Sequence, residues 1–528
     1  MPIFPKLVQK PPKLANHNRS HYFRDSVAPG ALVPIYVKPV NPGDEIYNQY
    51  ESLVNTQALF SPLYGSYKLK IMTFFAGTSL YVPKLWRNGS MQQTDGTLDA
   101  NYPLFDFAYA SGSTSPVKDL VVHPSSLLAK LGFNPGYLHP RNGVKGYNAI
   151  PILMYLDIFR HYFANRQEEK YPILDGSAFH SDDGYALAGL DSLFLNLPVN
   201  GGNVDTAVDG LVIRDMVNLC NKPLGGMLVG TYLPDRMSVI LNETFYSKNV
   251  TSVQVSTAGD KFQLDQLVTA KKLWNSRTKD AMSSGTFRDW IRMHFGVTPK
   301  IMDDMPTFLG ASISDIPFED IRATTSAKVG DTDQYLGDKA ASGLGYSRSR
   351  RHSVIADRPG YIMTIAQIVP QVDYYQNLER FVSYRKLSDE FRPEFNGIGL
   401  QDVLVSDINA DYTGNTAVYN DIADTEDPRT ISVGKQPAWI EYMTEVNRVR
   451  GTFCTSESSW VLARNMRANP ADVSSSPVDN TTISSYILPE DWNQPFAVRD
   501  AAAQNFYLQV YIRSKVRTTV LKRLLPYF

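Results

Sequence analysis

The chain has 528 residues, of which 52 are Lys or Arg and 53 are Asp or Glu, so its formal net charge is -1. This balance excludes a globally basic nucleic-acid-binding protein and an acidic tail protein. Hydrophobic residues make up 43% of the chain and charged residues 20%, which is typical of a folded protein with a large core.

The N-terminal segment is basic and rich in proline. It has no acidic residue before Asp25 and no apolar periodicity, so we expect an arm over residues 1–28 that is extended, and mobile unless it is bound. One folded domain is expected over residues 29–528. The arm lacks the apolar core of a signal peptide. No stretch of the chain approaches the ~18 apolar residues of a membrane-spanning helix, so no membrane contact is expected. The cations of the arm are Lys6, Lys10, Lys13, Arg19 and Arg24.

Two strands open the folded domain. Leu32–Val40 is rich in β-branched residues and ends at the turn sequence Asn41-Pro-Gly-Asp44, and Tyr67–Val82 predicts a longer strand. A large insertion is expected over residues 84–300. Its first part, residues 84–150, is predicted to be mostly loop, and a helix is predicted over Ile152–Phe163, where apolar residues recur at helical spacing.

Further helices, strands and loops follow towards the C-terminus. Helices are predicted over Phe262–Trp274 and after Thr286, a capping residue whose helix Gly296 ends. A strand is predicted over Gly360–Val372. Polar residues predict surface loops over 324–351 and 410–428.

The C-terminal segment combines a strand pattern with positive charge. Over residues 505–520 one parity is apolar (Phe506 to Val516), so it is expected to face the core. The other parity carries Tyr507, Gln509 and Tyr511, and then cations. No acidic residue follows Ala501, and the cations of this segment are Arg513, Lys515, Arg517, Lys522 and Arg523.

Both basic ends suit a single-stranded nucleic acid. Cations neutralise phosphates, and aromatic rings stack on bases without requiring a particular sequence. A second interpretation of the C-terminal strand stays open: its outward side chains are simply solvated, or they pair with charges on a neighbouring strand. The sequence therefore predicts ten genome-facing cations, five in each basic end.

The predicted strands are far apart, and the helices lie in the insertions between them. This pattern favours a mainly β fold, an antiparallel sandwich or jelly roll with long loops. No nucleotide-binding loop, zinc motif or nucleophile elbow is present, so we expect neither catalysis nor a bound cofactor or metal ion. The alternative is a β-sandwich carbohydrate-binding protein or glycoside hydrolase, with Asp182–Asp183 and Asp303–Asp304 as candidate acid and base.

Six short blocks occur in order between about residue 30 and residue 465. Together they resemble blocks of the major capsid proteins of microviruses (Microviridae), small icosahedral bacteriophages with circular single-stranded DNA, and in particular of the gokushovirus-like and related branches. The blocks are Val33–Asp44; Lys70–Pro83 followed by Trp86; Tyr155–Phe163; Phe287–Thr298 with Pro306–Ser312; Leu378–Arg380 with Phe391–Phe395 and Gly399–Gln401; and Lys435–Tyr442.

The resemblance implies a single eight-stranded antiparallel jelly roll with large inserted loops, in which residues 190–260 form a variable surface protrusion. It implies a homo-oligomer: a T=1 icosahedral shell around a single-stranded DNA genome, found in the virion and in the host cytoplasm during assembly. Further partners would be a small basic DNA-binding protein and scaffolding or pilot proteins.

Overall fold

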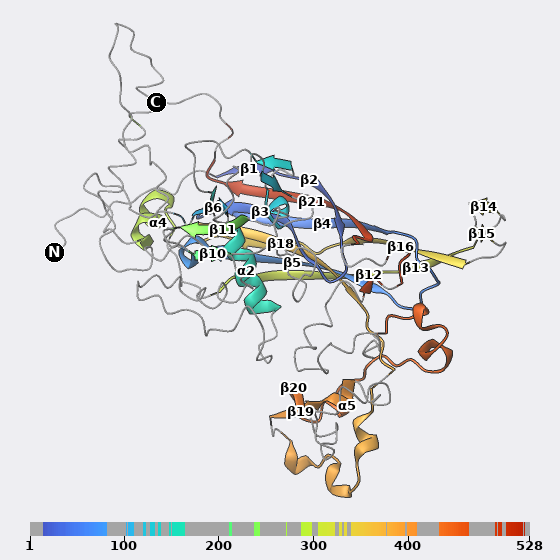
Figure 1. The fold of residues 1–528 in the computed structure, drawn as a ribbon. Coiled ribbons are helices and arrows are strands. Elements are labelled where there is room, and N and C mark those ends of the chain that lie inside the picture. The colour runs from blue at the N-terminus through green and yellow to red at the C-terminus, as the bar shows by residue number, and fades with distance from the viewer. Residues whose placement is uncertain are drawn as a thin grey trace.

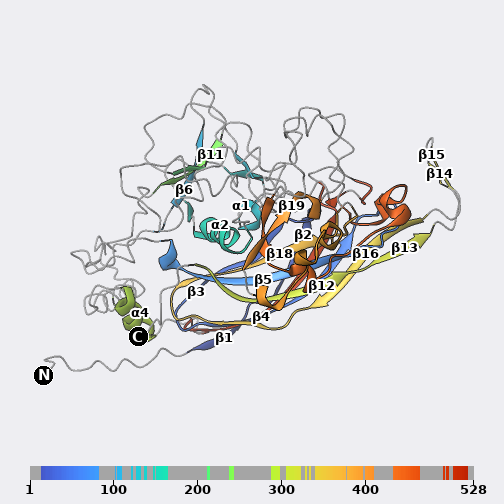
Figure 2. The ribbon, with the colours of Figure 1, turned by 90° about the horizontal axis from the view of Figure 1, so that it is seen from below.

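Two antiparallel β-sheets packed face to face form the centre of the protein (Figures 1 and 2). This computed structural model describes residues 14–81, most of 305–408, 432–463, 503–520 and 522, and short stretches within 102–163, 211–297 and 492–498. The mainly β class predicted from the sequence is confirmed.

The first sheet has seven strands in the order β1-β21-β4-β16-β13, with β2 also paired to β21 and β17 also paired to β4. Its longest pairing joins β21 and β4 over twelve register positions. The strands are β1 (Ala15–Asn18), β2 (His21–Val27), β4 (Glu45–Thr56), β13 (Phe318–Arg322), β16 (Lys339–Arg348), β17 (His352–Ile355) and β21 (Phe506–Thr518).

The second sheet has four strands in the order β12-β5-β18-β3. The core lies between the sheets and is rich in large side chains, among them the fully buried Tyr50, Tyr67 and Phe506. The strands are β3 (Leu32–Val40), β5 (Tyr67–Gly77), β12 (Thr307–Ile316) and β18 (Gly360–Pro370).

Several predicted elements are confirmed. Strands β3, β5 and β18 fall where apolar and β-branched runs predict them. The turn after β3 is closed by a hydrogen bond from Asp44 N to Asn41 O (3.1 Å), and Gly43 has a φ of 85°, which favours glycine. The predicted helices are α2 (Ile150–Tyr162) and α4 (Phe287–Phe295), and Gly296 ends α4 with a φ of 71°.

Residues 15–27 of the predicted arm are extended and belong to the first sheet. Strands β1 and β2 are hydrogen-bonded to successive parts of β21. The physical reason is that Phe23 packs against the core and Val27 is buried within it, while β21 would otherwise be an unpaired sheet edge. The first sheet therefore begins within the arm.

The predicted loop at 324–351 is wrong for residues 339–348, which form the strand β16. Its polar and glycine-rich sequence suggested a turn region. A Cβ on Gly343 would lie 2.7 Å from a ring carbon of Phe318, and one on Gly345 would lie 3.3 Å from Ile316. The glycines therefore allow close packing inside a strand, rather than marking turns.

Helix α2, in the insertion between β5 and β12, lies on the outer side of the second sheet (Figure 2). Phe74 of β5 packs against Tyr162 (4.9 Å between ring centroids), and Tyr155 donates a hydrogen bond to Leu32 O (2.8 Å). Residues 84–150, predicted to be mostly loop, contain several short elements. These are β6 (Leu104–Tyr109), β7 (Leu120–Val122), α1 (Leu127–Lys130), β8 (Gly136–Leu138) and β9 (Tyr147–Asn148).

Several predictions concern residues outside the described part of the chain. They include the helix over Phe262–Trp274 apart from Lys271, the loop 410–428, both aspartate pairs, and all of 190–260 except β10 (Leu211–Ile213) and β11 (Met237–Asn242). Strands β10, β11, β6 and β9 form one small sheet. No helix among the described residues is long and apolar enough to cross a membrane.

A network of polar side chains lies in the middle of the core. Tyr50 Oη and Thr364 Oγ1 are 2.6 Å apart, and Thr73 Oγ1 is 2.8 Å from His352 Nδ1 and 3.1 Å from Thr364 Oγ1. His352 is buried, and its Nε2 has no hydrogen-bond partner. Burial lowers the pKa of His352 below its ordinary 6.5 and raises the pKa of Tyr50 to about 12, so both groups are neutral at pH 7.

The burial of His352 leads us to predict that the protein loses stability in acid. Because the unfolded chain takes up this proton at a higher pH than the folded chain, the free energy of unfolding falls as the pH drops below 6.5. The fall reaches at most about 1.4 kcal/mol per pH unit and stops near the folded pKa. Denaturant unfolding at pH values of about 7.5, 6.5 and 5.5 measures it, with His352→Gln as control. An equal pH dependence in the variant would assign the effect to other groups.

Candidate nucleic-acid interface

The outer side of the first sheet is here called the open face. Along β4 and β21 alternate side chains are buried, and the intervening ones point away from the core. The core-facing parity predicted for residues 505–520 is confirmed, since Phe506, Leu508, Val510, Ile512 and Val516 are all buried. Among the described residues no helix packs on the open face, in contrast to the face that α2 covers (Figure 2).

Tyrosines are the most prominent side chains of the open face. Tyr22 of β2 and Tyr511 of β21 are directly opposite in the register, with ring centroids 4.7 Å apart. Tyr507 is about half exposed, and its hydroxyl accepts a hydrogen bond from Gln57 Nε2 (2.6 Å). Tyr346 of β16 is 70% exposed. The face thus presents ring surfaces from three strands of one sheet.

Cations surround these rings. Arg24 lies 5.4 Å from the ring centroid of Tyr22, and its Nε donates to Gln509 Oε1 (2.9 Å). Arg513 lies 6.0 Å from the ring centroid of Tyr511. Such contacts hold guanidinium groups beside aromatic rings, where a base and its phosphate would be contacted together.

Two glutamates of β4 neutralise part of this charge. Arg513 and Arg348 both pair with Glu51 (3.2 and 3.3 Å), and Arg517 pairs with Glu45 (3.4 Å). The alternative that the cations pair with a neighbouring strand therefore holds for Arg513 and Arg517. No described carboxylate lies within ion-pair distance of Arg24 or Lys515.

The open face nevertheless keeps a positive balance. Its outward cations are Arg24, Arg348, Arg513, Lys515 and Arg517, against the three carboxylates of Glu45, Glu51 and Glu319. Two cations therefore remain in excess. Because both glutamates of β4 are already held by arginine, a polyanion at β4 and β21 would meet positive charge rather than carboxylate repulsion.

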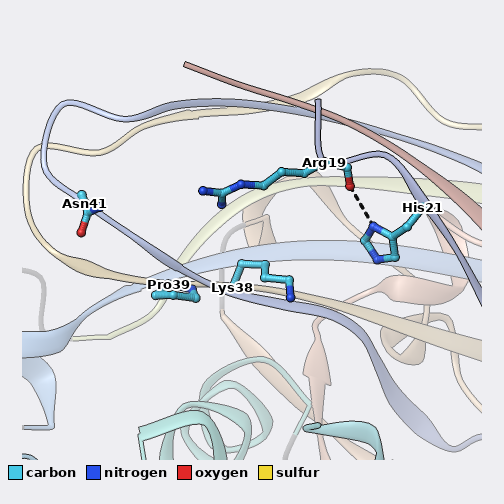
Figure 3. Close-up of a pocket in the computed structure, with 5 residues that line it drawn as sticks. All are labelled: Arg19, His21, Lys38, Pro39 and Asn41. Atoms are coloured by element: carbon cyan, nitrogen blue, oxygen red, sulfur yellow. Dashed lines mark hydrogen bonds between the residues drawn. The ribbon is translucent and has the colours of Figure 1, made fainter. Parts of the chain in front are cut away.

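Arg19 lies away from the open face. Together with His21, Lys38, Pro39 and Asn41 it lines a hollow of about 570 Å³ beside β3 (Figure 3). His21 Nδ1 is 2.9 Å from Arg19 O, and the His21 ring stacks on Tyr36 at 5.9 Å. The two cations that line this hollow have no carboxylate beside them among its lining residues.

Of the other predicted cations, only Arg19 and Lys522 are among the described residues. Lys522 is exposed just beyond the end of β21, and Lys6, Lys10, Lys13 and Arg523 lie outside the described residues. Of the ten predicted cations, the structure brings four together: Arg24, Arg513, Lys515 and Arg517.

Sequence reasoning predicted Arg24 of β2 but missed Tyr22 on the same strand and the contribution of β4 and β16 to this surface. Tyr22, Tyr47, Tyr346 and Arg348 reach the open face only because these strands flank β21 or lie next to its neighbour. A strand over Glu45–Thr56 could have been predicted from its alternating sequence, because alternate positions carry the apolar Ile46, Tyr50 and Val54. Asn48 and Ser52 fall on the same parity.

Comparison with known proteins supplies the family. The model of the family described as capsid protein (F protein), a phage protein family, matches residues 246–519, just over half of the chain. The matched residues include β12, β16, β18 and β21, which are strands of both sheets. No curated protein matches the chain. The chain belongs to the F-protein family of phage capsid proteins, which confirms the predicted resemblance to the major capsid proteins of microviruses.

Proposed function

We propose that this capsid protein assembles into a T=1 icosahedral shell around single-stranded DNA and contacts the genome through its open face. As a member of a structural family it is a component of the virion. The observation that carries the genome contact is the exposed sheet surface that combines tyrosines and cations, with two positive charges in excess. No catalytic role is part of the proposal, and family membership favours it over a carbohydrate-active protein.

The order of the strands supports a single eight-stranded jelly roll. In chain order β2, β3, β4 and β5 alternate between the two sheets, β12 stays in the second sheet beside β5, and β16, β18 and β21 alternate again. The resulting orders, β2-β21-β4-β16 and β3-β18-β5-β12, are those of two interlocked Greek keys. Residues 29–528 would then be one domain with long insertions, to which the arm adds β1 and β2.

The proposals of a T=1 shell and of further partners are based on membership of the capsid protein family. Electron microscopy of particles from cells that express the chain tests T=1 assembly, because uniform small particles are expected and mixed or open aggregates would contradict it. We also propose assembly in the host cytoplasm with a small basic DNA-binding protein and with scaffolding or pilot proteins. The cations outside the open face, including Arg19 and Lys522, remain candidates for the same genome contact.

Reversing the two unpaired cations of the open face is expected to weaken DNA binding. In the variant Arg24→Glu with Lys515→Glu, the excess of two positive charges becomes a deficit of two. The logarithm of the affinity for an oligothymidylate should then depend less steeply on salt, by about 1.4 in slope for two lost phosphate contacts. Fluorescence binding to a labelled oligonucleotide measures this slope between roughly 50 and 300 mM NaCl, where the screening of exposed charges changes strongly.

The matched control is Arg24→Lys with Lys515→Arg, which keeps both charges. It should bind DNA with the same salt slope as the original chain. Particles of the reversed variant should also contain less DNA, as judged from the ratio of absorbance by nucleic acid and by protein. Unchanged salt dependence together with unchanged DNA content would overturn the assignment of the open face.

A further inference from the structure

Part of the segment between β18 and β21 lies outside the two sheets. Residues 373–463, here called the 373–463 insertion, leave β18 and return beside it: Asp373 N donates to Leu462 O (3.0 Å), and Tyr374 N donates to Asn447 O (3.0 Å). Its described elements are short and lie below the sandwich in Figure 1. They are β19 (Leu400–Leu404), β20 (Ser432–Pro437), α5 (Val405–Ile408) and several 3-10 turns.

An aromatic cluster lies on this insertion. The ring centroids of Phe391 and Trp439 are 5.5 Å apart, and those of Phe391 and Tyr442 are 5.7 Å apart. Trp439 has a φ of 63°, a left-handed conformation that is unusual for a bulky residue. Its backbone N–H donates to Gln401 Oε1 (3.1 Å) and its indole N–H donates to Phe395 O (3.3 Å).

Further hydrogen bonds fix the surroundings of the cluster. Glu441 accepts one from Tyr384 Oη (3.0 Å) and one from Gln401 Nε2 (3.0 Å). Arg380 pairs with Asp407 at 3.1 Å. Strained backbone conformations persist only where surrounding contacts determine them, and they concentrate at functional positions. The cluster is thus held in one arrangement by the contacts around it.

The surface around the cluster remains apolar and exposed. Leu387 is 78% exposed, and Phe381, Leu400 and Met443 are each more than 60% exposed. A two-stranded sheet with short 3-10 turns is marginal on its own in water, because it buries little apolar surface. Such a surface is typical of a protein that is completed by a partner.

Charges of both signs alternate along this surface. Between residues 385 and 394 the exposed charged side chains are Arg385, Lys386, Glu390, Arg392 and Glu394, and no described residue forms an ion pair with them. Contact across a twofold axis places a surface against its own copy, so it requires cations and anions on the same patch. The open face, with its positive excess, lacks this self-complementarity.

We propose that the 373–463 insertion docks on the same insertion of a second copy of this chain across a twofold axis, with the cluster of Phe391, Trp439 and Tyr442 at its centre. This inference rests on the proposed function, because it assigns a contact within the shell. The flanking cations Arg385 and Lys386 would face Glu390 and Glu394 of the second copy.

Charge exchange between two variants of the full chain tests this contact. The first variant carries Arg385→Glu and Lys386→Glu, and the second carries Glu390→Lys and Glu394→Lys. Each alone is expected to form about tenfold fewer particles, because like charges then face each other. Co-expression of both should restore particles, and so should one chain with all four substitutions, which matches the original in total charge. Gradient sedimentation and electron microscopy count the particles.

The outcomes separate this inference from the proposed function. If the original chain forms no particles, the proposed shell is overturned. If it forms particles and the two variants do so equally well, the insertion is not a shell contact. If both variants lose assembly and co-expression restores nothing, the insertion contacts a different surface and the twofold contact is overturned. Equal melting temperatures of the variants would show that folding is intact.

Discussion

Replacing Tyr67 with alanine is expected to lower the free energy of unfolding by about 3–5 kcal/mol, the usual cost of removing a large aromatic side chain from a core. Tyr67 begins β5 and is fully buried. Its ring contacts Phe506 (5.0 Å between centroids), Phe318 (5.6 Å) and Phe496 (6.1 Å). These neighbours come from the facing sheet and from the segment before β21, so the surrounding chain cannot collapse into the space left behind.

Two variants separate the parts of this effect. Tyr67→Phe keeps the ring but removes the hydrogen bond that Tyr67 Oη donates to Trp492 O (2.8 Å). It should cost about 0.5–1.5 kcal/mol, the usual net contribution of one hydrogen bond. Tyr346→Ala removes a tyrosine that is 70% exposed and should change stability by less than about 0.5 kcal/mol. Denaturant unfolding of the three variants decides; equal losses for Tyr67→Ala and Tyr346→Ala would contradict the packing argument.

Strands can be predicted from the sequence where large apolar residues form a continuous run or alternate with polar ones. Leu32–Val40 and Phe506–Thr518 carry runs of large residues, so their position follows from the sequence, and the buried parity of the second follows from alternation alone. The pattern fails at β16, where Gly343 and Gly345 occupy core-facing positions. Glycine is required at both positions because Phe318 and Ile316 occupy the space that a side chain would need. Such a contact between separate strands leaves no pattern in the sequence of either strand.

The candidate site was only partly predictable for a similar reason. A strand reveals which of its own side chains point outward, so Tyr511, Arg513, Lys515 and Arg517 could be assigned from one segment. The neighbours of that strand depend on sheet topology. Glu45 and Glu51 lie on β4, near the other end of the chain, and neutralise two of its arginines. The sequence could therefore predict the kind of surface, but not its net charge.

The second large effect is expected at Gly360, the first residue of β18. Strand β18 is central in the second sheet, and Gly360 faces Val40 of β3 on one side and Gly77 of β5 on the other. A Cβ at this position would lie 2.3 Å from Ala76 O and 2.9 Å from two ring carbons of Phe75. The nearest atom belongs to the backbone of a paired strand, so a side-chain rotation cannot relieve the clash.

Gly360→Ala should therefore separate β18 from β5 locally and cost about 3 kcal/mol, at the upper end of overpacking effects. Gly310→Ala is the matched control in the same sheet, because its Cβ would lie 3.4 Å from the His352 ring, an ordinary contact. It should cost less than about 1 kcal/mol, since the added methyl group meets no backbone atom. Thermal unfolding of both variants tests the difference. If Gly360→Ala lowers stability no more than Gly310→Ala does, strands β18 and β5 can move apart at little cost. That result would contradict the argument from their close pairing.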